Sequence, residues 1–256
     1  MSADPWLPAL GGPAGPAPDV VCFPHAGGAA SFFRPWAADA RAAGLRLWCA
    51  QYPGREDRLD EPPRTDIAAL ADPLAAAAAG LGEHGLVLFG HSMGALVAYE
   101  VARRLDAGTP LALVVSGRRP PAVPPERIRH ELADDALVAE LAALGGPTLL
   151  LSRPDTRAIF LPGIRADLRA AETYRHAPGP LLRAPITAVV GDADGEVGPD
   201  LARGWAAHTR GAFALSVQPG DHFYLLPRRR AVLDLLLAGA RTAAPALCHP
   251  VVVERD

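Results

Sequence analysis

One stretch of the chain, residues 86–100, constrains the fold more than any other. An unbroken apolar run, Leu86–Phe89, ends at Gly90, Ser92 follows, and a run of helix-forming residues starts directly after Gly94. This pattern predicts a buried strand, a sharp turn and a helix. Strand and helix can approach each other closely at such a turn because the glycines two before and two after the serine carry no side chain.

The same turn predicts a reactive serine. In a strand–turn–helix of this kind, called a nucleophile elbow, the serine hydroxyl stands clear of the sheet near the N-terminus of the helix. We therefore expect Ser92 to be the nucleophile and the backbone N–H of Met93 to face a developing oxyanion. Gly-x-Ser-x-Gly can arise by chance in a chain with 25 glycines, so the interpretation also depends on the partners of Ser92.

Composition bounds the class of protein. A chain of 256 residues, half of them hydrophobic, can bury the core of one α/β domain. A net charge of −3 without a basic stripe excludes a nucleic-acid binder, and no apolar run reaches the ~18 residues of a membrane span. Cys22, Cys49 and Cys248 are too few and too scattered for a disulfide framework or a metal site. Because the chain also shows no signal-peptide pattern, we expect a cytoplasmic monomer without metal or cofactor.

Short apolar runs alternate with helical patterns along most of the chain, which predicts an α/β fold with a mostly parallel sheet and helices on both faces. Strands are expected at 20–23, 45–51, 86–90, 111–116, 186–190 and 213–217, and helices at 32–43, 65–81, 93–107 and 231–241.

Changes in composition suggest the domain boundaries. We expect a flexible leader over 1–18, a core formed by 19–117 and 181–243, a helical insertion over 118–180 and a C-terminal tail over 244–256. The insertion starts with a proline-dense exit after Gly117, and its clearest helices are expected at 131–143 and 162–174. A helical insertion between two core strands is typical of a lid over a hydrolase active site. The apolar residues that fit a surface closing over an acyl group are Leu144, Leu149, Leu150, Phe160 and Leu161.

The general base is expected in a loop beyond the carboxyl end of a strand, where functional groups gather in open parallel sheets. Of eight histidines, only His25, His91 and His222 lie in such loops. Because His91 adjoins Ser92 and faces the wrong way, we expect it to support the elbow and His222 to be the base.

The carboxylate that orients the base is expected after the strand 186–190. Asp192, Asp194 and Glu196 all follow this strand, and their spacing does not choose between them. Each of the three precedes His222, so each gives the chain order nucleophile, acid, base that this type of fold uses.

The second oxyanion donor is expected in a loop of small residues, 24–30, that follows the strand at 20–23. We assign it to the backbone N–H of Ala26, with His25 and Gly27 shaping the loop. Small residues suit a place where the backbone must approach a ligand closely.

Six motifs, in this order, make the chain resemble the type II thioesterases that accompany polyketide synthases and nonribosomal peptide synthetases. The resemblance covers residues 20–242 and is far more specific than the elbow alone. The motifs are Phe23-Pro24-His25-Ala26-Gly27-Gly28, Tyr52-Pro53-Gly54-Arg55-Glu56, Gly90-His91-Ser92-Met93-Gly94, Leu161-Pro162 with Arg165-Ala166-Asp167, Gly191-Asp192-Ala193-Asp194, and Gly220-Asp221-His222-Phe223.

The resemblance implies an α/β-hydrolase fold and a serine thioesterase with the triad Ser92, Asp194 and His222. It implies hydrolysis of aberrant or stalled acyl groups from the phosphopantetheine arms of acyl or peptidyl carrier proteins, through an acyl-serine. Since carrier domains are acidic, Arg118, Arg119 and Arg165 are a hypothetical docking rim. The alternatives are a chain-releasing thioesterase or acyltransferase, a carboxylic ester hydrolase, and a catalytically silent binding module.

Overall fold

A seven-stranded sheet in the order β1-β3-β2-β4-β5-β6-β7 forms the centre of the computed structural model, which describes residues 4–146 and 148–243. Neighbouring strands are parallel except for β1 and β3, which confirms the predicted sheet. The strands are β1 (Ala9–Gly11), β2 (Asp19–Phe23), β3 (Arg46–Cys49), β4 (Leu86–His91), β5 (Leu111–Ser116), β6 (Ile186–Gly191) and β7 (Phe213–Gln218).

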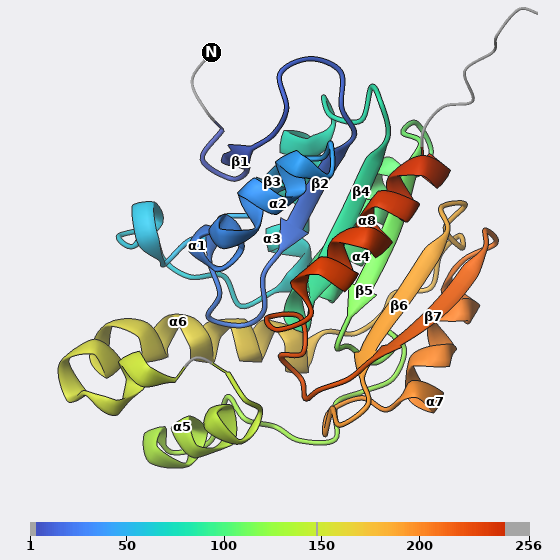
Figure 1. The fold of residues 1–256 in the computed structure, drawn as a ribbon. Helices are drawn as coiled ribbons and strands as arrows, with labels where there is room; N and C mark the ends of the chain where they lie inside the picture. The colour runs from blue at the N-terminus through green and yellow to red at the C-terminus, as the bar shows by residue number, and fades with distance from the viewer. Residues whose placement is uncertain (1–3, 147, 244–256) are drawn as a thin grey trace, which may run out of the picture.

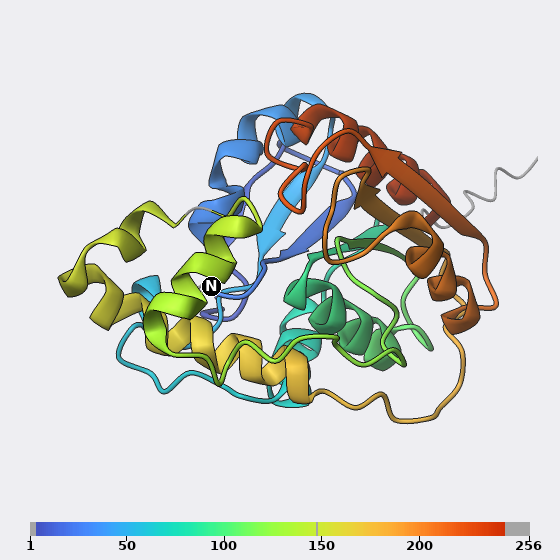
Figure 2. The same ribbon diagram turned by 90° about the horizontal axis from the view of Figure 1, so that it is seen from below.

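Helices cover both faces of the sheet (Figures 1 and 2). One face packs against α1 (Ala30–Phe33), the 3-10 turn η1 (Arg34–Trp36), α2 (Ala37–Ala42) and α8 (Arg229–Ala243). The other packs against α3 (Ile67–Ala78), α4 (Met93–Leu105), α7 (Pro199–Ala202) and the 3-10 turn η4 (Arg203–His208). A further 3-10 turn, η2, spans Glu56–Arg58. None of the helices in the described ranges is both long and apolar enough to span a membrane.

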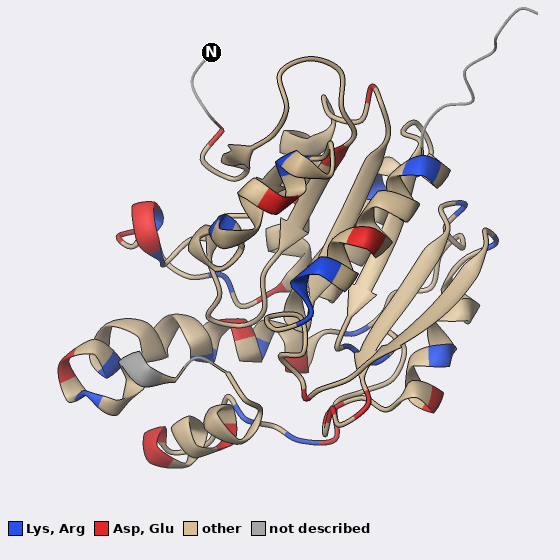
Figure 3. Cartoon of the chain, viewed as in Figure 1, with Lys and Arg blue, Asp and Glu red and all other residues tan. Residues whose placement is uncertain are grey.

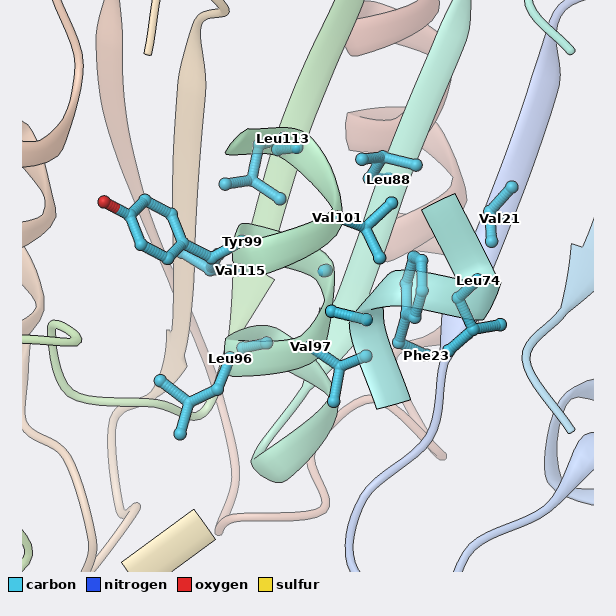
Figure 4. Close-up of a cluster of buried hydrophobic side chains, with 14 of the residues drawn as sticks. Val21, Phe23, Leu74, Leu88, Leu96, Val97, Tyr99, Val101, Leu113 and Val115 are labelled. Atoms are coloured by element: carbon cyan, nitrogen blue, oxygen red, sulfur yellow. The ribbon is translucent and has the colours of Figure 1, made fainter. Parts of the chain in front are cut away.

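The core between the sheet and α3 and α4 explains why the central strands read as continuous apolar runs. Every residue of β4 and β5 is buried, since both faces of these strands are covered. Leu88 and Val115 from the strands meet Leu74 of α3 and Val97 of α4 in one cluster (Figure 4). Burying each such side chain contributes about 1.5–3 kcal/mol, so this cluster holds the elbow helix firmly on the sheet.

Residues 4–18 differ from the expected flexible leader. Here β1 pairs antiparallel with β3, and the Cys49 N–H donates to the Pro8 carbonyl at 3.2 Å. Leu7 is buried, and the Arg58 guanidinium lies 3.9 Å from the centre of the Trp6 ring. A three-residue edge strand among prolines and glycines has no periodicity to detect, which is why composition pointed to a leader.

Two helix boundaries also differ from the prediction, both because of proline. The helix expected over 32–43 is divided into α1, η1 and α2 around Pro35. The helix expected from Pro162 already begins at Pro154, which occupies the first turn, and Pro162 lies inside it. By contrast, Asp66 caps α3 as its position suggests, accepting the Ala69 N–H at 2.9 Å.

The segment between β5 and β6 contains α5 (Asp134–Ala143), η3 (Leu149–Ser152) and α6 (Pro154–Thr173), with no strand in its described residues. It lies beyond the carboxyl ends of the strands, next to the end of β4 (Figures 1 and 2). Leu161 is buried, whereas Phe160 is 39% exposed and does not serve the predicted apolar surface. The side chains of Leu149 and Leu150, like the tail at 244–256, lie outside the described residues.

The packing of residues 4–18 generates a prediction about stability. Leu7→Ala should lower the free energy of unfolding by about 2–4 kcal/mol, because it removes a buried side chain and leaves a cavity. Leu59→Ala is the control, since Leu59 is 48% exposed and its truncation should cost well under 1 kcal/mol. Urea denaturation followed by circular dichroism measures both values. Equal, small losses would mean that this segment does not pack as described.

Candidate active site

Ser92 occupies the turn between β4 and α4 in a strained backbone conformation. Its φ of 55° and ψ of −119° lie outside the regions that non-glycine residues normally adopt. A Cβ at Gly90 would collide with the Gly94 carbonyl, and a Cβ at Gly94 would collide with the Phe23 carbonyl. The close packing of β4, α4 and β2 therefore requires both glycines and holds the serine at the N-terminus of α4.

The structure pairs His222 with Asp194. The Nδ1 of His222, in the loop after β7, lies 3.1 and 3.0 Å from the two carboxylate oxygens of Asp194, in the loop after β6. Since a carboxylate only accepts, Nδ1–H donates, and in the neutral ring the lone pair is then on the other nitrogen, Nε2. Both side chains are buried, and His222 lines the same cavities as Ser92. This arrangement can supply a base whose tautomer is fixed.

The two other acidic residues after β6 have different partners. Asp192 accepts the Gly220 N–H at 2.9 Å and so joins the loop after β6 to the loop after β7. Glu196 forms an ion pair with Arg129. Within the described residues, neither of these two carboxylates is paired with His222. The geometry therefore distinguishes three candidates that spacing alone could not separate.

His25 and His91 are buried beside His222. The His91 ring lies 4.9 Å from that of His222, and its Nδ1 is 2.9 Å from the Ser116 hydroxyl. His25 packs between Phe32 and Phe223, with ring centres 4.6 and 4.9 Å away. Burial, reinforced by His222 and Arg55, lowers the pKa of His25 to about 3. Burial likewise holds the pKa of His91 well below its usual range, so both rings are neutral near neutral pH.

Two backbone N–H groups beside Ser92 are free to bind an oxyanion. Neither the Met93 nor the Ala26 N–H has a hydrogen-bond acceptor within the described ranges of the chain. Both residues line the cavity at Ser92. Two unpartnered donors, one at the start of α4 and one in the loop after β2, can stabilise negative charge that develops on a carbonyl oxygen.

A buried ion pair fixes the loop that carries Ala26. The Nη2 of Arg55 lies 2.8 Å from Oδ1 of Asp167, and both side chains are almost fully buried. Oδ2 of Asp167 accepts the Gly27 N–H at 2.7 Å, and Nη1 of Arg55 donates to the Gly28 carbonyl at 3.0 Å. Although burial opposes the charge, Asp167 raises the pKa of Arg55. The pair thus ties α6 to the oxyanion loop.

This role was not predicted from the sequence. Arg55 and Asp167 both lie in motifs that carry the resemblance, but they are 112 residues apart and nothing local links them. The only signal was that two motifs of the resemblance each contain a charged residue, Arg55 in one and Asp167 in the other.

An apolar cavity of about 110 Å³ adjoins Ser92 and His222. Its floor is formed by the oxyanion loop, and its walls come largely from the segment between β5 and β6. The apolar side chains that line it are Leu141, Leu144, Leu151, Ile164, Leu168 and Phe223. The cavity therefore suits a short hydrocarbon chain attached to a carbonyl at Ser92.

The arginines expected to form a docking rim donate hydrogen bonds to backbone carbonyls of the protein. Arg119 is buried and donates to the carbonyls of Pro124 and Glu196. Arg165 donates to the carbonyls of His130 and Leu132. Arg118 donates to the Ala171 carbonyl and lines a cavity beside Ser92.

The described residues contain no cluster of three His, Cys, Asp or Glu side chains that could hold a metal ion. Cys22 and Cys49 are free and buried, as expected, and burial holds both thiol pKa values well above their usual range. Cys248 lies outside the described residues.

The fold defines an enzyme of the α/β-hydrolase type: a mostly parallel sheet covered by helices, with a serine on a strained turn at the head of a helix. The chain belongs to the thioesterase family, since the model of the thioesterase domain matches residues 18–238. Its class of activity is therefore thioester hydrolysis.

Individual relatives agree with this assignment. Over 219 residues the chain is 40% identical to thioesterase PikA5 of Streptomyces venezuelae, spanning 82% of this chain and 78% of that protein. It is 40% identical over 216 residues to a probable cadicidin biosynthesis thioesterase of Streptomyces griseus, but spans only 60% of that protein and 83% of itself. The type II thioesterase BorB from the borrelidin biosynthetic cluster superposes with a TM-score of 0.85 at 43% identity, covering 94% of this chain and all of BorB.

The Arg55–Asp167 pair generates a prediction about catalysis. Asp167→Asn should lower the free energy of unfolding by about 3–5 kcal/mol, because it leaves a buried guanidinium without its counter-charge. In molecules that remain folded, kcat for a short acyl thioester should fall while KM changes little, because the Ala26 donor is displaced. Chemical denaturation and steady-state kinetics measure these two effects.

Asp134→Asn is the matched control, since Asp134 forms an exposed ion pair with Arg165 on the same segment. It should cost less than about 1 kcal/mol and leave kcat unchanged. An Asp167→Asn variant that is destabilised but keeps the kcat of the parent would show that the pair has no influence on the oxyanion loop.

The low pKa of His25 predicts how stability depends on pH. The unfolded chain binds a proton at His25 near pH 6.5, whereas the folded chain does so only near pH 3. The unfolded state therefore binds more protons in this window, so the free energy of unfolding falls as the pH is lowered from about 6.5 towards 3. His25→Phe should reduce this slope by up to about 1.4 kcal/mol per pH unit. Urea denaturation at several pH values measures the slope; identical slopes would contradict the prediction.

Proposed function

We propose that this chain hydrolyses aberrant or stalled acyl groups from the phosphopantetheine arms of carrier proteins in polyketide or nonribosomal peptide synthesis. One observation carries the proposal: Ser92, on a strained turn, shares a cavity with a histidine that is paired with a buried aspartate. The membership of the thioesterase family and the similarity to a type II thioesterase select thioesters as the substrate.

Acylation uses Ser92, His222 and the two free N–H groups. Nε2 of His222 removes the hydroxyl proton of Ser92 as Oγ attacks the thioester carbonyl. The carbonyl oxygen gains negative charge and is held by the N–H groups of Met93 and Ala26. Asp194 stabilises the imidazolium that forms. When the C–S bond breaks, its electron pair goes to sulfur, which as a thiolate is a good leaving group. The imidazolium of His222 then gives the proton to this sulfur, so the carrier departs as a thiol and His222 is neutral again.

Deacylation repeats the same steps with water. His222 removes a proton from a water molecule that attacks the acyl-serine, and the same two N–H groups hold the second oxyanion. Collapse of this intermediate returns the proton to Ser92 and releases the carboxylic acid. The reaction draws on the side chains of this chain and on water, with the acyl group supplied by the partner carrier protein.

The apolar cavity favours short acyl chains. Its volume of about 110 Å³ and its leucine-rich walls suit a small saturated acyl group. Such a group is left on a carrier protein when an extender unit loses its carboxylate. A long polyketide or peptide intermediate would have to extend beyond this cavity. The cavity therefore supports removal of short, unproductive groups over release of a finished product.

The test is hydrolysis of a propionyl group from a phosphopantetheinylated carrier protein, followed by mass spectrometry of the carrier. The wild-type chain should regenerate the free thiol, and Ser92→Ala should lower the rate by at least about 10⁴-fold, because the nucleophile is lost. Ser31→Ala is the control, since Ser31 is exposed on α1 and should leave the rate unchanged.

Three results would separate the alternatives. Transfer of propionate to an added alcohol or amine in preference to water would indicate an acyltransferase. Cleavage of carboxylic esters with an intact acyl carrier would indicate an ester hydrolase. Full biological complementation by Ser92→Ala would indicate a binding module.

A further inference from the structure

A second cavity reaches Ser92 from another side. It has a volume of about 100 Å³ and is lined by Ser92, Met93 and His222 together with charged side chains of the loops after β5 and β6 and of α6. Leu144 and Leu168 line both this cavity and the apolar one. The two cavities therefore meet at the reacting serine, one with apolar walls and one with charged walls.

Most charged side chains in the walls of this polar cavity neutralise one another. The loop between β5 and α5 carries both basic and acidic residues (Figure 3). Glu172 accepts the backbone N–H groups of Arg129 and His130. The ion pairs in the walls are Arg119 with Glu126, Arg127 with Glu140, and Arg129 with Glu140 and Glu196.

Arg118 is the exception. Its Nη2 donates to the Ala171 carbonyl at 3.1 Å, but its Nε is buried without an acceptor and no carboxylate of the described chain lies within ion-pair distance. Burial, with a contribution from Arg119, lowers the pKa of Arg118 only to about 10, so the guanidinium is charged near neutral pH. A guanidinium has five N–H donors, and a buried donor without an acceptor costs free energy. Since Nε is fully buried, the donor that Arg118 can offer to the cavity is Nη1, which has no acceptor within the described residues.

We infer that the polar cavity binds the thiol arm of the thioester and that Arg118 donates a hydrogen bond to the amide carbonyl nearest the sulfur. The inference rests on the proposed function. A thioester has two arms, and the apolar cavity suits the hydrocarbon one. In a pantetheine arm, a short spacer separates the sulfur from the first amide. Burying that amide in an apolar cavity would cost free energy, because it would lose its hydrogen bonds to water. In the polar cavity its carbonyl can accept a hydrogen bond from Nη1 of Arg118.

The same donor could in principle meet a carboxylate oxygen of a dicarboxylic acyl group. The thiol arm is the better occupant, because the proposed function places the acyl chain in the apolar cavity and the two arms of a thioester at Ser92 need separate space. Malonyl thioesters, which carry an acyl carboxylate on either thiol, separate these two sources of the oxygen in the experiment.

The experiment compares two thioesters with the same propionyl group and thiol arms of the same length. One arm is N-acetylcysteamine, which has the amide, and the other is pentanethiol, which lacks it. Arg118→Met should lower kcat/KM for the N-acetylcysteamine thioester by about tenfold or more, the range for a hydrogen bond to a charged group. The change for the pentyl thioester should stay below about twofold. Because each change is taken relative to the unsubstituted chain, the different leaving-group strengths of the thiols cancel.

Equal losses on both thioesters would assign Arg118 a structural role and overturn the inference. Loss confined to a malonyl thioester, whichever thiol it carries, would assign the guanidinium to an acyl carboxylate and overturn it as well. If the unsubstituted chain hydrolysed neither propionyl thioester, the proposed function itself would fail and the inference with it.

A second measurement needs no variant and so does not depend on the folding of Arg118→Met. Two unreactive thioethers, each a 2-oxobutyl group on one of the same two thiols, are compared as inhibitors of the unsubstituted chain. The N-acetylcysteamine thioether should bind at least about tenfold more tightly, although the pentyl thioether is the more hydrophobic. Equal affinity, or tighter binding of the pentyl thioether, would contradict the inference.

Discussion

The close approach of β4 and α4 at Gly90 and Gly94 is the constraint on which the active site depends. It leaves Ser92 no ordinary backbone conformation, so the serine takes a positive φ and its side chain leaves the plane of the sheet. The buried cluster beneath α4 opposes relaxation of this strain. A rigid turn is useful here because the oxyanion donors and the base must meet the nucleophile at fixed distances.

The other parts of the site come from loops that the sheet gathers at one edge. His222 and Asp194 follow β7 and β6, while the loop with Ala26 follows β2 on the other side of β4. Loops without further contacts would be too mobile to hold these groups at fixed distances from Ser92. In this structure, side-chain interactions hold them in place. The Arg55–Asp167 pair ties the loop that carries Ala26 to α6, so the segment that walls the apolar cavity also holds the backbone N–H that we propose as an oxyanion donor.

Sequence reasoning succeeded where the determinants were local and failed where they were distant. The elbow could be predicted because strand, glycines and helix lie within fifteen residues, residues 86–100. The choice of Asp194 over Asp192 and Glu196 required the resemblance to a family, since it depends on the loop after β7. The braces at Arg55 and Arg118 could not be predicted, because their partners are far along the chain. The edge strand β1 was missed because three residues carry no period.

The most direct test of the account is covalent trapping of the nucleophile with a fluorophosphonate, which forms a stable adduct with an activated serine. Peptide mass spectrometry of the treated chain should find one adduct, on Ser92, and His222→Ala should abolish it, because the hydroxyl is then no longer activated. Labelling at another residue, or labelling of Ser92 at an unchanged rate without His222, would contradict the assignment of Ser92 and His222 as nucleophile and base.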